Sequence, residues 1–386
     1  MLGPLTGIKI LDLTNVISGP FATMILADQG ADVIKVELPG VGDFVRSTGN
    51  KQGGMSATFL NNNRNKRSIT VDLKDQRGKD VLLKLVESCD AMVQNFRPGV
   101  VERIGISYDD VKKVKPDIVY LSISGFGEKG PYSQKPTYDP IVQALSGLTT
   151  VQAGSDQERP RLIRTIVPDK VTALTASQAM TAGLLSKFRT GEGQHIRLSM
   201  LDSVIAFMWS SDMGGQTYVG KQISAQRAAS FIDLIYETKD GYMSVSTMTN
   251  AQWAGLSRAT ENPEWLDDER FQSAELRDLN INDRLELVQC ALIKKTTQEQ
   301  LGLLEANNVP CATVLTRKVL IEHPQIWDSS VLVERIIRKQ GVCGRRGRRR
   351  DLRESPRAFA TVRRNLVRTR TTFCRTQVFP MMRSRR

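Results

Sequence analysis

The sequence predicts an α/β protein with a large domain built on a doubly wound, mainly parallel sheet and a smaller α+β second domain. Short apolar segments alternate with segments of helical length over the first 210 residues, an order typical of parallel sheets with helices on both faces. The pattern changes near residue 225, where two short apolar segments flank a turn at 239–241. We therefore expect a large domain at 1–224, a small domain at 225–330 and a tail at 331–386.

The first elements illustrate the alternation. Residues 8–13 form an apolar strand, Pro20 and Gly30 stand where a helix can begin and end, and 33–37 form a second strand. The first turn has no GxGxxG motif, so the hypothesis of a nicotinamide-binding protein loses its main support. The other expected elements are strands at 68–73, 91–94, 118–123 and 195–200, helices at 76–88, 108–114, 170–188 and 201–209, a hairpin of 231–236 with 242–246, and a strand at 309–315.

The positive charge of the chain is confined to its tail. The sequence has 54 basic and 41 acidic residues, a formal net charge of +13. Residues 341–386 hold 15 of the basic residues, all arginine, and two acids, which leaves 39 basic and 39 acidic residues in 1–340. The neutral body does not indicate nucleic acid as a partner.

Several classes of protein are disfavoured by composition. There is no apolar run of about 18 residues, so no membrane span is expected, and the first residues lack the pattern of a secretory signal. The five cysteines are scattered without a CxxC pair. This argues against structural zinc or disulfides and for a reducing compartment, and we expect a cytoplasmic protein without a metal site.

Histidine is nearly absent, since only His195 and His323 occur, and there is no GxSxG motif. Hydrolases that depend on a Ser–His–Asp or Cys–His arrangement are therefore not supported. Asp169 is the most suggestive acid, because it follows Pro168 directly before an expected helix, where amide N–H groups and the helix dipole can keep it ionised. A plain N-cap role explains the same position.

Two loops at strand ends offer places for a ligand. The segment SGFGEKGP at 124–131 contains three glycines, which allow a substrate to approach the backbone. The next candidate, NFRPG, places Arg97 at the edge where ligands bind in open α/β sheets. Arg97 could meet a polyphosphate together with Lys74, Arg103 and Lys135, although each is equally explained as a solvated surface charge.

Five motifs, in order and with fitting spacing, resemble family III of the CoA-transferases, which includes formyl-CoA, oxalate, succinyl-CoA and carnitine-type transferases. They are PLTGIKILDL at 4–13, GADVIKVE at 30–37, NKRSI at 65–69, NFRPG at 95–99 and YDP at 138–140. The resemblance covers about 1–330. It implies transfer of coenzyme A from an acyl-CoA to a carboxylic acid, an interlocked homodimer, and no cofactor beyond the coenzyme A thioester, which is a substrate.

The resemblance also implies roles for individual residues. Asp169 matches the family's nucleophilic aspartate, which forms an anhydride with the acyl group and then a thioester with coenzyme A. The backbone N–H groups of Gly125, Phe126 and Gly127 are candidates for stabilising oxyanions. The implied coenzyme A contacts are Val16, Ile17, Ser18, Lys74, Asn95, Arg97, Arg103, Lys135 and Tyr138.

Some features depart from parts of the family. Leu38 stands where formyl-CoA transferase has a phosphate-binding arginine, and the glycine-run loop of that enzyme is not seen around 225–260, so formyl-CoA is not favoured as substrate. The α-methylacyl-CoA racemases of the family exchange a proton with a His/Asp pair. Here Tyr138 precedes Asp139, and a tyrosine with a pKa near ~10 is a poor base at neutral pH. A transferase is therefore favoured over a racemase-like enzyme.

The tail does not resemble the acidic, helix-forming end of the family's chains. Its basic residues from 341 are arginine alone, without helical or strand periodicity. This composition is typical of an off-frame reading of GC-rich DNA, so we interpret it as a frameshift near 335–345 that leaves the tail outside the native core. The alternatives are an arginine-rich arm that binds RNA or another polyanion, and an inactive relative of the family.

Overall fold

The computed structural model describes residues 3–220, 234–329, 331–333 and 361–362. These residues form two compact units, a large one within Met1–Gln226 and Ser330–Arg386 and a small one within Arg227–Ser329. The predicted boundaries near 224 and 330 fall on residues outside the description. Almost all of the predicted tail also lies outside the described residues. Its described parts are residue 331, β12 (Leu332–Val333) and β13 (Thr361–Val362).

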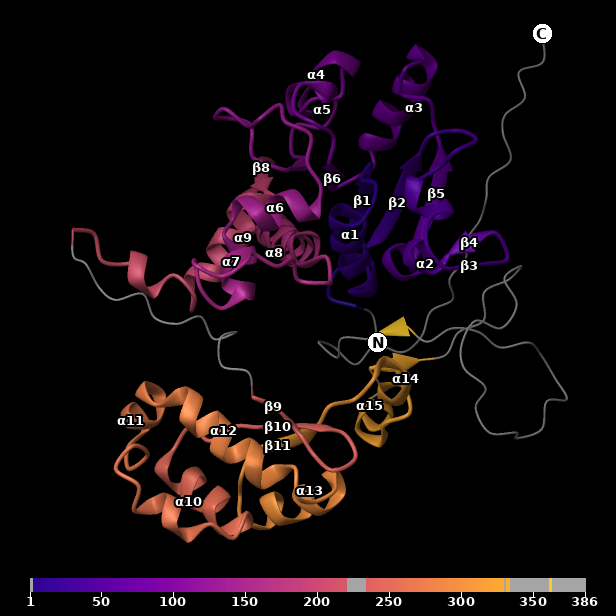
Figure 1. The fold of residues 1–386 in the computed structure, drawn as a ribbon. Helices are drawn as coiled ribbons and strands as arrows, with labels where there is room; N and C mark the ends of the chain where they lie inside the picture. The colour runs from indigo at the N-terminus through magenta and orange to yellow at the C-terminus, as the bar shows by residue number, and fades with distance from the viewer. Residues whose placement is uncertain (1–2, 221–233, 330, 334–360, 363–386) are drawn as a thin grey trace, which may run out of the picture. The chain divides into compact units, whose positions relative to one another are not determined.

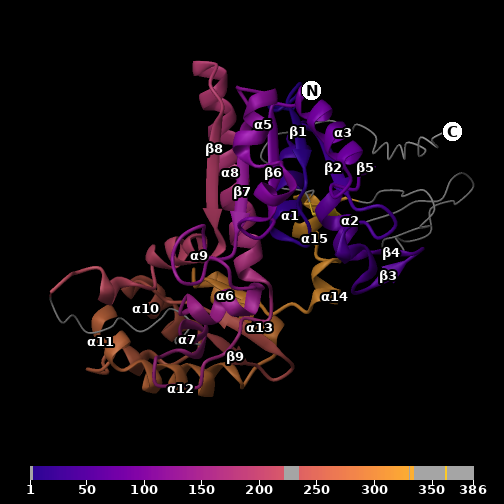
Figure 2. The same ribbon diagram turned by 90° about the horizontal axis from the view of Figure 1, so that it is seen from above.

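The large unit contains a six-stranded sheet in which every neighbouring pair is parallel (Figures 1 and 2). Its order is β5-β2-β1-β6-β7-β8, so the chain moves from β1 to β2 on one side and later to β6 on the other. The strands are β1 (Lys9–Asp12), β2 (Asp32–Glu37), β5 (Lys66–Thr70), β6 (Ala91–Gln94), β7 (Val119–Ser124) and β8 (Gln194–Ser199). A separate hairpin joins β3 (Lys51–Gln52) to β4 (Met55–Ser56).

Helices cover both faces of this sheet because successive strand residues point to opposite sides. Ile10 packs with residues of α1 (Ser18–Asp28) and α8 (Val167–Thr190). The next residue, Leu11, packs on the other face with residues of α3 (Gln76–Val86), α4 (Val100–Ile104) and α5 (Tyr108–Val114). The predicted doubly wound, mainly parallel architecture is confirmed. The remaining helices of this unit are α2 (Ala57–Asn63), α6 (Asp139–Leu145), α7 (Leu148–Ala153) and α9 (Met200–Trp209).

Small side chains let α8 approach its neighbours closely. Ala173 and Ala176 share a core with α1. A Cβ atom on Gly183 would lie 2.8 Å from the Cδ1 atom of Ile196 and 2.9 Å from the Cγ1 atom of Val119. The helix is thereby fixed against both α1 and the β7–β8 end of the sheet, and its first turn has a defined position.

The small unit is an α+β structure, as predicted. An antiparallel sheet has the order β11-β10-β9, and its core includes Trp253, which stacks on Trp265 with ring centroids 5.5 Å apart. The strands are β9 (Ile235–Glu237), β10 (Tyr242–Val245) and β11 (Cys311–Thr313). The helices are α10 (Asn250–Ala259), α11 (Ala274–Leu279), α12 (Ile281–Leu292), α13 (Thr297–Ala306), α14 (Arg317–Leu320) and α15 (Pro324–Asp328).

A buried ion pair lies under the carboxyl edge of the large sheet. The Nζ atom of Lys66 is 2.9 Å from Oδ2 of Asp12, and it also donates to the Pro20 carbonyl (2.8 Å) and to Oδ1 of Asn63 (2.9 Å). Burial disfavours the charged form of Asp12, but Lys66 and further cationic and hydroxyl neighbours outweigh it and lower the pKa of Asp12 to about 2. Burial lowers the pKa of Lys66 to about 8. The predicted strand at 68–73 begins two residues earlier, so that Lys66 belongs to β5.

A second buried pair stands beside the first. The Nζ atom of Lys35 is 2.9 Å from Oδ2 of Asp43 and donates to the Thr14 carbonyl at 2.6 Å. Lys35 is 1% exposed and Asp43 is fully buried. Since Thr14 follows β1, the two pairs together hold the start of the turn that leads from β1 to α1.

We expect Lys66→Met to lower the free energy of unfolding by about 3–5 kcal/mol, because it leaves the buried Asp12 carboxylate without its ion-pair partner. The double variant Asp12→Asn with Lys66→Met should recover part of this loss, since neither charge then remains. Urea denaturation measures both, with Lys84→Met on the exposed side of α3 as the matched control. A single-variant loss no larger than that of the control would contradict the importance of the pair.

Candidate active site

Two loops meet at the carboxyl ends of β1 and β6, where the strand order reverses. The amide oxygen of Asn95 accepts from the Asn15 N–H (2.9 Å), and its amide nitrogen donates to the Asn15 carbonyl (2.8 Å). This crevice is where open α/β sheets bind ligands. Asn95, a predicted coenzyme A contact, is thus engaged with the backbone of the turn after β1.

The turn after β1 contains a residue in the left-handed region. Val16 has φ of 72°, a conformation that costs a β-branched residue about 1–3 kcal/mol and persists only where the surrounding structure imposes it. Its N–H donates to Oδ1 of Asp43 (3.2 Å), and the next residue, Ile17, packs against Phe59. These contacts fix the predicted site residues Val16 and Ile17, and they make Ser18 the first residue of α1.

Asp169 lies inside α8, in its first turn. The helix begins at Val167, and Ile166 is its N-cap. The prediction that Asp169 precedes the helix, with an N-cap as the plain alternative, is therefore wrong. Pro168 explains the difference, because a proline has no N–H to leave unbonded in the first turn and its φ suits a helix.

The Asp169 carboxylate is bound from another helix. Ser18 donates to it through both its hydroxyl and its backbone N–H, and the N-terminus of α1 contributes partial positive charge. Burial and the negative charge of Asp139 oppose these donors and raise the pKa of Asp169 to about 6. A carboxyl group perturbed by burial and a specific charged neighbour is a candidate functional group.

Asp139 was not predicted as a site residue, yet it is the second acid of the site. It is 4% exposed at the start of α6, and its Oδ2 atom accepts from the Asp169 N–H at 3.3 Å. Burial raises the pKa of Asp139. Gln143 donates to Oδ1 of Asp139 (2.6 Å) and accepts from the Ile163 N–H (2.9 Å). Asp139 thus joins α6 to the first turn of α8, and Gln143 adds the segment before α8.

Three of the predicted phosphate contacts are exposed cations. Lys74, Arg97 and Arg103 lie at or beyond the ends of β5 and β6, and within the described part of the chain none is within ion-pair distance of a carboxylate. Gly99, which precedes α4, has φ of 84°, in the left-handed region that favours glycine. The charge of the three cations is available to an anion.

The loop between β7 and α6 brings two further predicted residues together. Lys135 and Phe126 line one groove of about 310 Å³ with Tyr132 and Ile141. The Nζ atom of Lys135 lies 3.3 Å from the centroid of the Tyr132 ring. Tyr138, at the N-cap of α6, is 70% exposed.

The glycine loop is constrained by its own contacts. A Cβ atom on Gly125 would lie 2.0 Å from Cγ2 of Thr137, so no larger residue fits there. The Gly127 N–H donates to Oγ of Ser124 at 3.1 Å. Of the three predicted oxyanion donors, Gly127 is therefore already engaged inside the loop.

The two histidines serve the fold. His195 lies in β8, with Nε2 2.8 Å from Oγ of Ser122 and its ring stacked on Tyr108, and burial lowers its pKa. His323 is the N-cap of α15, where its Nδ1 atom accepts from the Gln325 N–H. No group of three metal-ligating side chains was found among the described residues.

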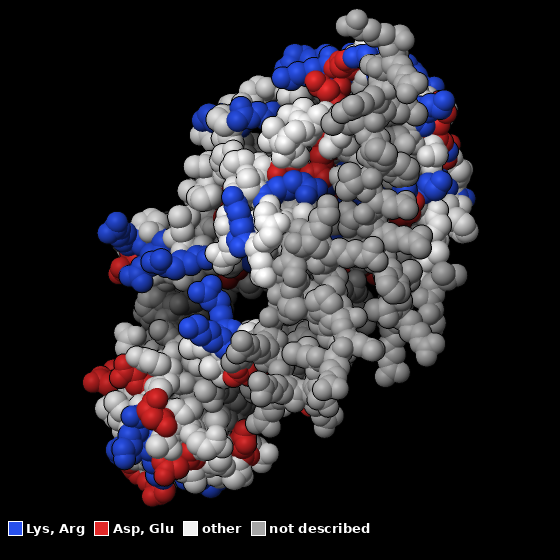
Figure 3. Space-filling view, turned by 90° about the vertical axis from the view of Figure 1, so that its right-hand side faces the viewer, with Lys and Arg blue, Asp and Glu red and all other residues white. Residues whose placement is uncertain are grey.

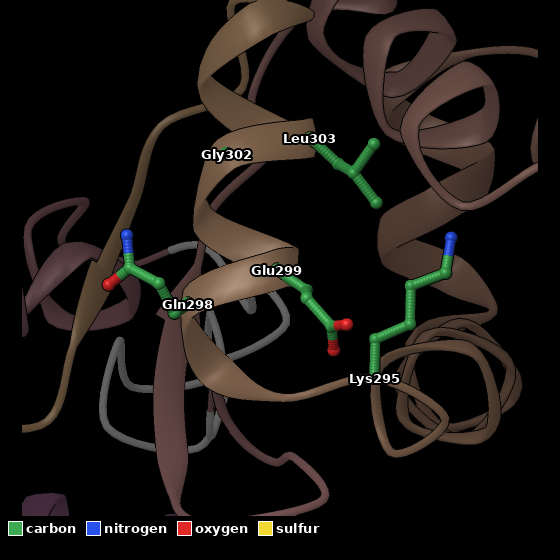
Figure 4. A pocket seen from close by; sticks show the side chains of 5 residues that line it. All are labelled: Lys295, Gln298, Glu299, Gly302 and Leu303. Atoms are coloured by element: carbon green, nitrogen blue, oxygen red, sulfur yellow. The ribbon is translucent and has the colours of Figure 1, made fainter.

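A larger hollow in the small unit is lined by charged side chains that already have partners. It measures about 450 Å³ beside α13 and includes Lys295, Glu299 and Leu303 (Figure 4). Lys295 is paired with Glu261 at 2.9 Å, and Glu299 accepts from the N–H and hydroxyl of Thr296 as part of a capping box. These charges stabilise the local fold, and the candidate site remains in the large unit.

Comparison with known proteins identifies the family of the chain. CoA-transferase family III matches residues 5–348. The chain belongs to this family. It is thus an acyl-CoA transferase, as the sequence motifs predicted, and the match extends beyond the expected 1–330.

None of the described helices is long and apolar enough to cross a membrane.

The relatives of this transferase include proteins whose names specify a pair of substrates. It is 35% identical over 338 residues to the succinyl-CoA:glutarate CoA-transferase of Homo sapiens, covering 86% of this chain and 76% of the relative. It is 32% identical to the acetyl-CoA:oxalate CoA-transferase of Acetobacter aceti, covering 86% of both chains.

Solved structures show the same fold. A hypothetical protein from Mycobacterium tuberculosis has a TM-score of 0.76 at 29% identity, covering 86% of this chain and 90% of that one. A CAIB/BAIF family protein from Brucella suis has a TM-score of 0.77 at 28% identity, covering 94% and 97%. The fold class is therefore confirmed by both comparisons.

The raised pKa of Asp169 predicts a pH-dependent effect of Asp169→Asn on stability. The folded protein holds this proton up to about pH 6, against an ordinary value of 3.8, so the free energy of unfolding falls as pH rises through that window. Asp169→Asn removes this loss and should be more stable than the wild type at pH 7.5, with a smaller difference at pH 4. Urea denaturation at both pH values measures it. An equal difference in the free energy of unfolding between variant and wild type at the two pH values would contradict the raised pKa of Asp169.

Proposed function

We propose that this transferase moves coenzyme A between an acyl-CoA and a free carboxylic acid with Asp169 as the nucleophile. The observation that carries the proposal is the Asp169 carboxylate between the Ser18 donors and the buried Asp139, in a chain of family III. Its raised pKa makes the ionised form more reactive than an ordinary carboxylate, while most of it stays ionised at neutral pH. The names of relatives support succinyl, acetyl, glutarate and oxalate groups as types of substrate.

The proposed reaction has four exchanges at carbonyl carbons. An Asp169 oxygen attacks the donor thioester and the C–S bond breaks, which gives an aspartyl anhydride and coenzyme A thiolate. The thiolate attacks the aspartyl carbonyl and releases the donor acid, leaving an aspartyl thioester. The acceptor carboxylate displaces the thiolate to form a second anhydride. The thiolate then attacks the acceptor acyl carbon, which yields the new acyl-CoA and the free Asp169 carboxylate.

Residues around Asp169 have distinct tasks in this scheme. The Ser18 N–H and hydroxyl hold the carboxylate before attack, and the same donors face the oxyanion when the aspartyl carbonyl becomes tetrahedral. Binding of the remote nucleotide helps to orient the thioester, and orientation can contribute about 7–11 kcal/mol. We assign coenzyme A binding to Val16, Ile17, Ser18, Lys74, Asn95, Arg97, Arg103, Lys135 and Tyr138. We further propose an interlocked homodimer and no cofactor beyond the coenzyme A thioester.

Asp169→Asn should reduce turnover about a thousandfold or more, because the neutral amide is a poor nucleophile. Asp202→Asn is the matched control, since Asp202 is the exposed third residue of α9 as Asp169 is the third residue of α8. Hydroxylamine added during wild-type turnover should form a hydroxamate at Asp169, detected by peptide mass mapping. Undiminished turnover of Asp169→Asn, or repeated turnover without modification, would refute the covalent mechanism.

Arg97→Gln and Lys74→Gln should each raise KM for the acyl-CoA about tenfold, since a charge-assisted contact to phosphate contributes about 1.5–3 kcal/mol. KM for the acceptor acid should stay near the wild-type value. Steady-state kinetics with each substrate varied in turn separates the two effects, with Lys84→Gln as the control. Equal increases for donor and acceptor would count against the assignment.

A further inference from the structure

The arginines of the large unit fall into two groups. Arg46, Arg64, Arg67, Arg77 and Arg197 each pair with a carboxylate. The other described arginines of this unit, which have no such partner among the described residues, are Arg97, Arg103, Arg159, Arg161, Arg164 and Arg189. Figure 3 shows both basic and acidic side chains on one face of the chain. The unpaired arginines lie on a few segments of the chain.

Three unpaired arginines lie on one segment, between α7 and α8. Arg159, Arg161 and Arg164 are all exposed, and the segment leads directly into the first turn of α8, which contains Asp169. Arg97 and Arg103, two of the four predicted phosphate contacts, lie elsewhere, beyond β6. The charge before α8 is thus separate from these two arginines.

The backbone of this segment is fixed beside the acid pair. The Arg161 N–H donates to the Thr149 carbonyl at 3.0 Å, and the Ile163 N–H donates to Gln143 at 2.9 Å. Gln143 in turn donates to Asp139, which accepts from the Asp169 N–H. Three hydrogen bonds therefore connect Ile163, the neighbour of Arg164, to Asp169. The backbone is anchored while the guanidinium groups remain without an acid.

We infer that Arg164, assisted by Arg161, binds the distal carboxylate of a dicarboxylic substrate whose other carboxyl group reacts at Asp169. This inference rests on the proposed function. The two carboxyl carbons of a four- or five-carbon dicarboxylic acid are roughly 4–5 Å apart when extended. One carboxyl group can therefore react at Asp169 while the other is bound by a residue of the adjoining segment. A guanidinium group presents two parallel N–H donors to a carboxylate, so it selects a dicarboxylate over a neutral-ended acid.

The test compares glutarate with its monoamide, glutaramate, as acceptors. The two have the same length, and only the distal carboxylate is replaced by a neutral amide. Arg164→Gln should lower the ratio of kcat/KM for glutarate to that for glutaramate at least tenfold, and Arg161→Gln should lower it less. Arg189→Gln is the control, because Arg189 is equally exposed but stands 20 residues after Asp169 on α8, about 30 Å away. A ratio within twofold of the wild type in Arg164→Gln would overturn the inference.

A binding measurement separates this inference from the transferase mechanism. Glutarate is titrated calorimetrically into Asp169→Asn protein with and without Arg164→Gln. Weakening of at least tenfold by Arg164→Gln supports the subsite even if the wild type transfers no coenzyme A, in which case only the proposed function fails. Equal glutarate affinity in both proteins, or no binding to either at millimolar concentration, overturns the subsite. A hydroxamate at Asp169 under turnover would then leave the transferase mechanism standing.

Discussion

Asp12 and Lys66 form an ion pair beneath the turn that follows β1, and both side chains are almost fully excluded from water. A charge in such a place costs several kcal/mol unless its partners are well placed. Lys66 meets this requirement with acceptors from β1, α1 and α2, namely Asp12, Pro20 and Asn63. The beginning of α1 is therefore tied to two strands, and the position of Ser18 at that beginning follows from it.

The position of Ser18 matters because two opposing effects meet at Asp169. Ser18 donors and the α1 N-terminus favour the ionised carboxylate, whereas burial and the charge of Asp139 disfavour it, and the latter prevail. In the proposed mechanism, stability is thus lost where reactivity is gained, as is common at functional sites. The strained Val16 in the preceding turn belongs to the same arrangement, because Asp43 and the apolar contacts of Ile17 hold it there.

The sequence predicts the sheet well because strand and helix periods are local properties. Asp169 is predicted as a site residue from its place after Pro168 and from the family resemblance, but its partners are not, since Ser18 and Asp169 are 151 positions apart and meet only through the packing of α1 on α8. The predicted start of this helix at residue 170 is three residues late, because a proline at position 168 resembles a boundary but fits inside the first turn of α8. A usable signal existed for the buried pairs: Lys35 interrupts an apolar strand, where a charge is tolerated only with a partner. Asp139 lies in the family motif at 138–140, but nothing local in the sequence indicates its contact with Asp169.

The proposed chemistry also explains why the site needs no histidine. Each step exchanges oxygen for sulfur, or sulfur for oxygen, at a carbonyl carbon, and no proton is transferred. A hydroxyl nucleophile would need a base to remove its proton, whereas a carboxylate with a pKa of about 6 is already about nine-tenths ionised at pH 7. Its weakness as a nucleophile is the remaining difficulty. Burial and the neighbouring charge of Asp139 reduce that weakness by making the ionised form less stable, so in this scheme they supply the activation that a histidine supplies in a serine hydrolase.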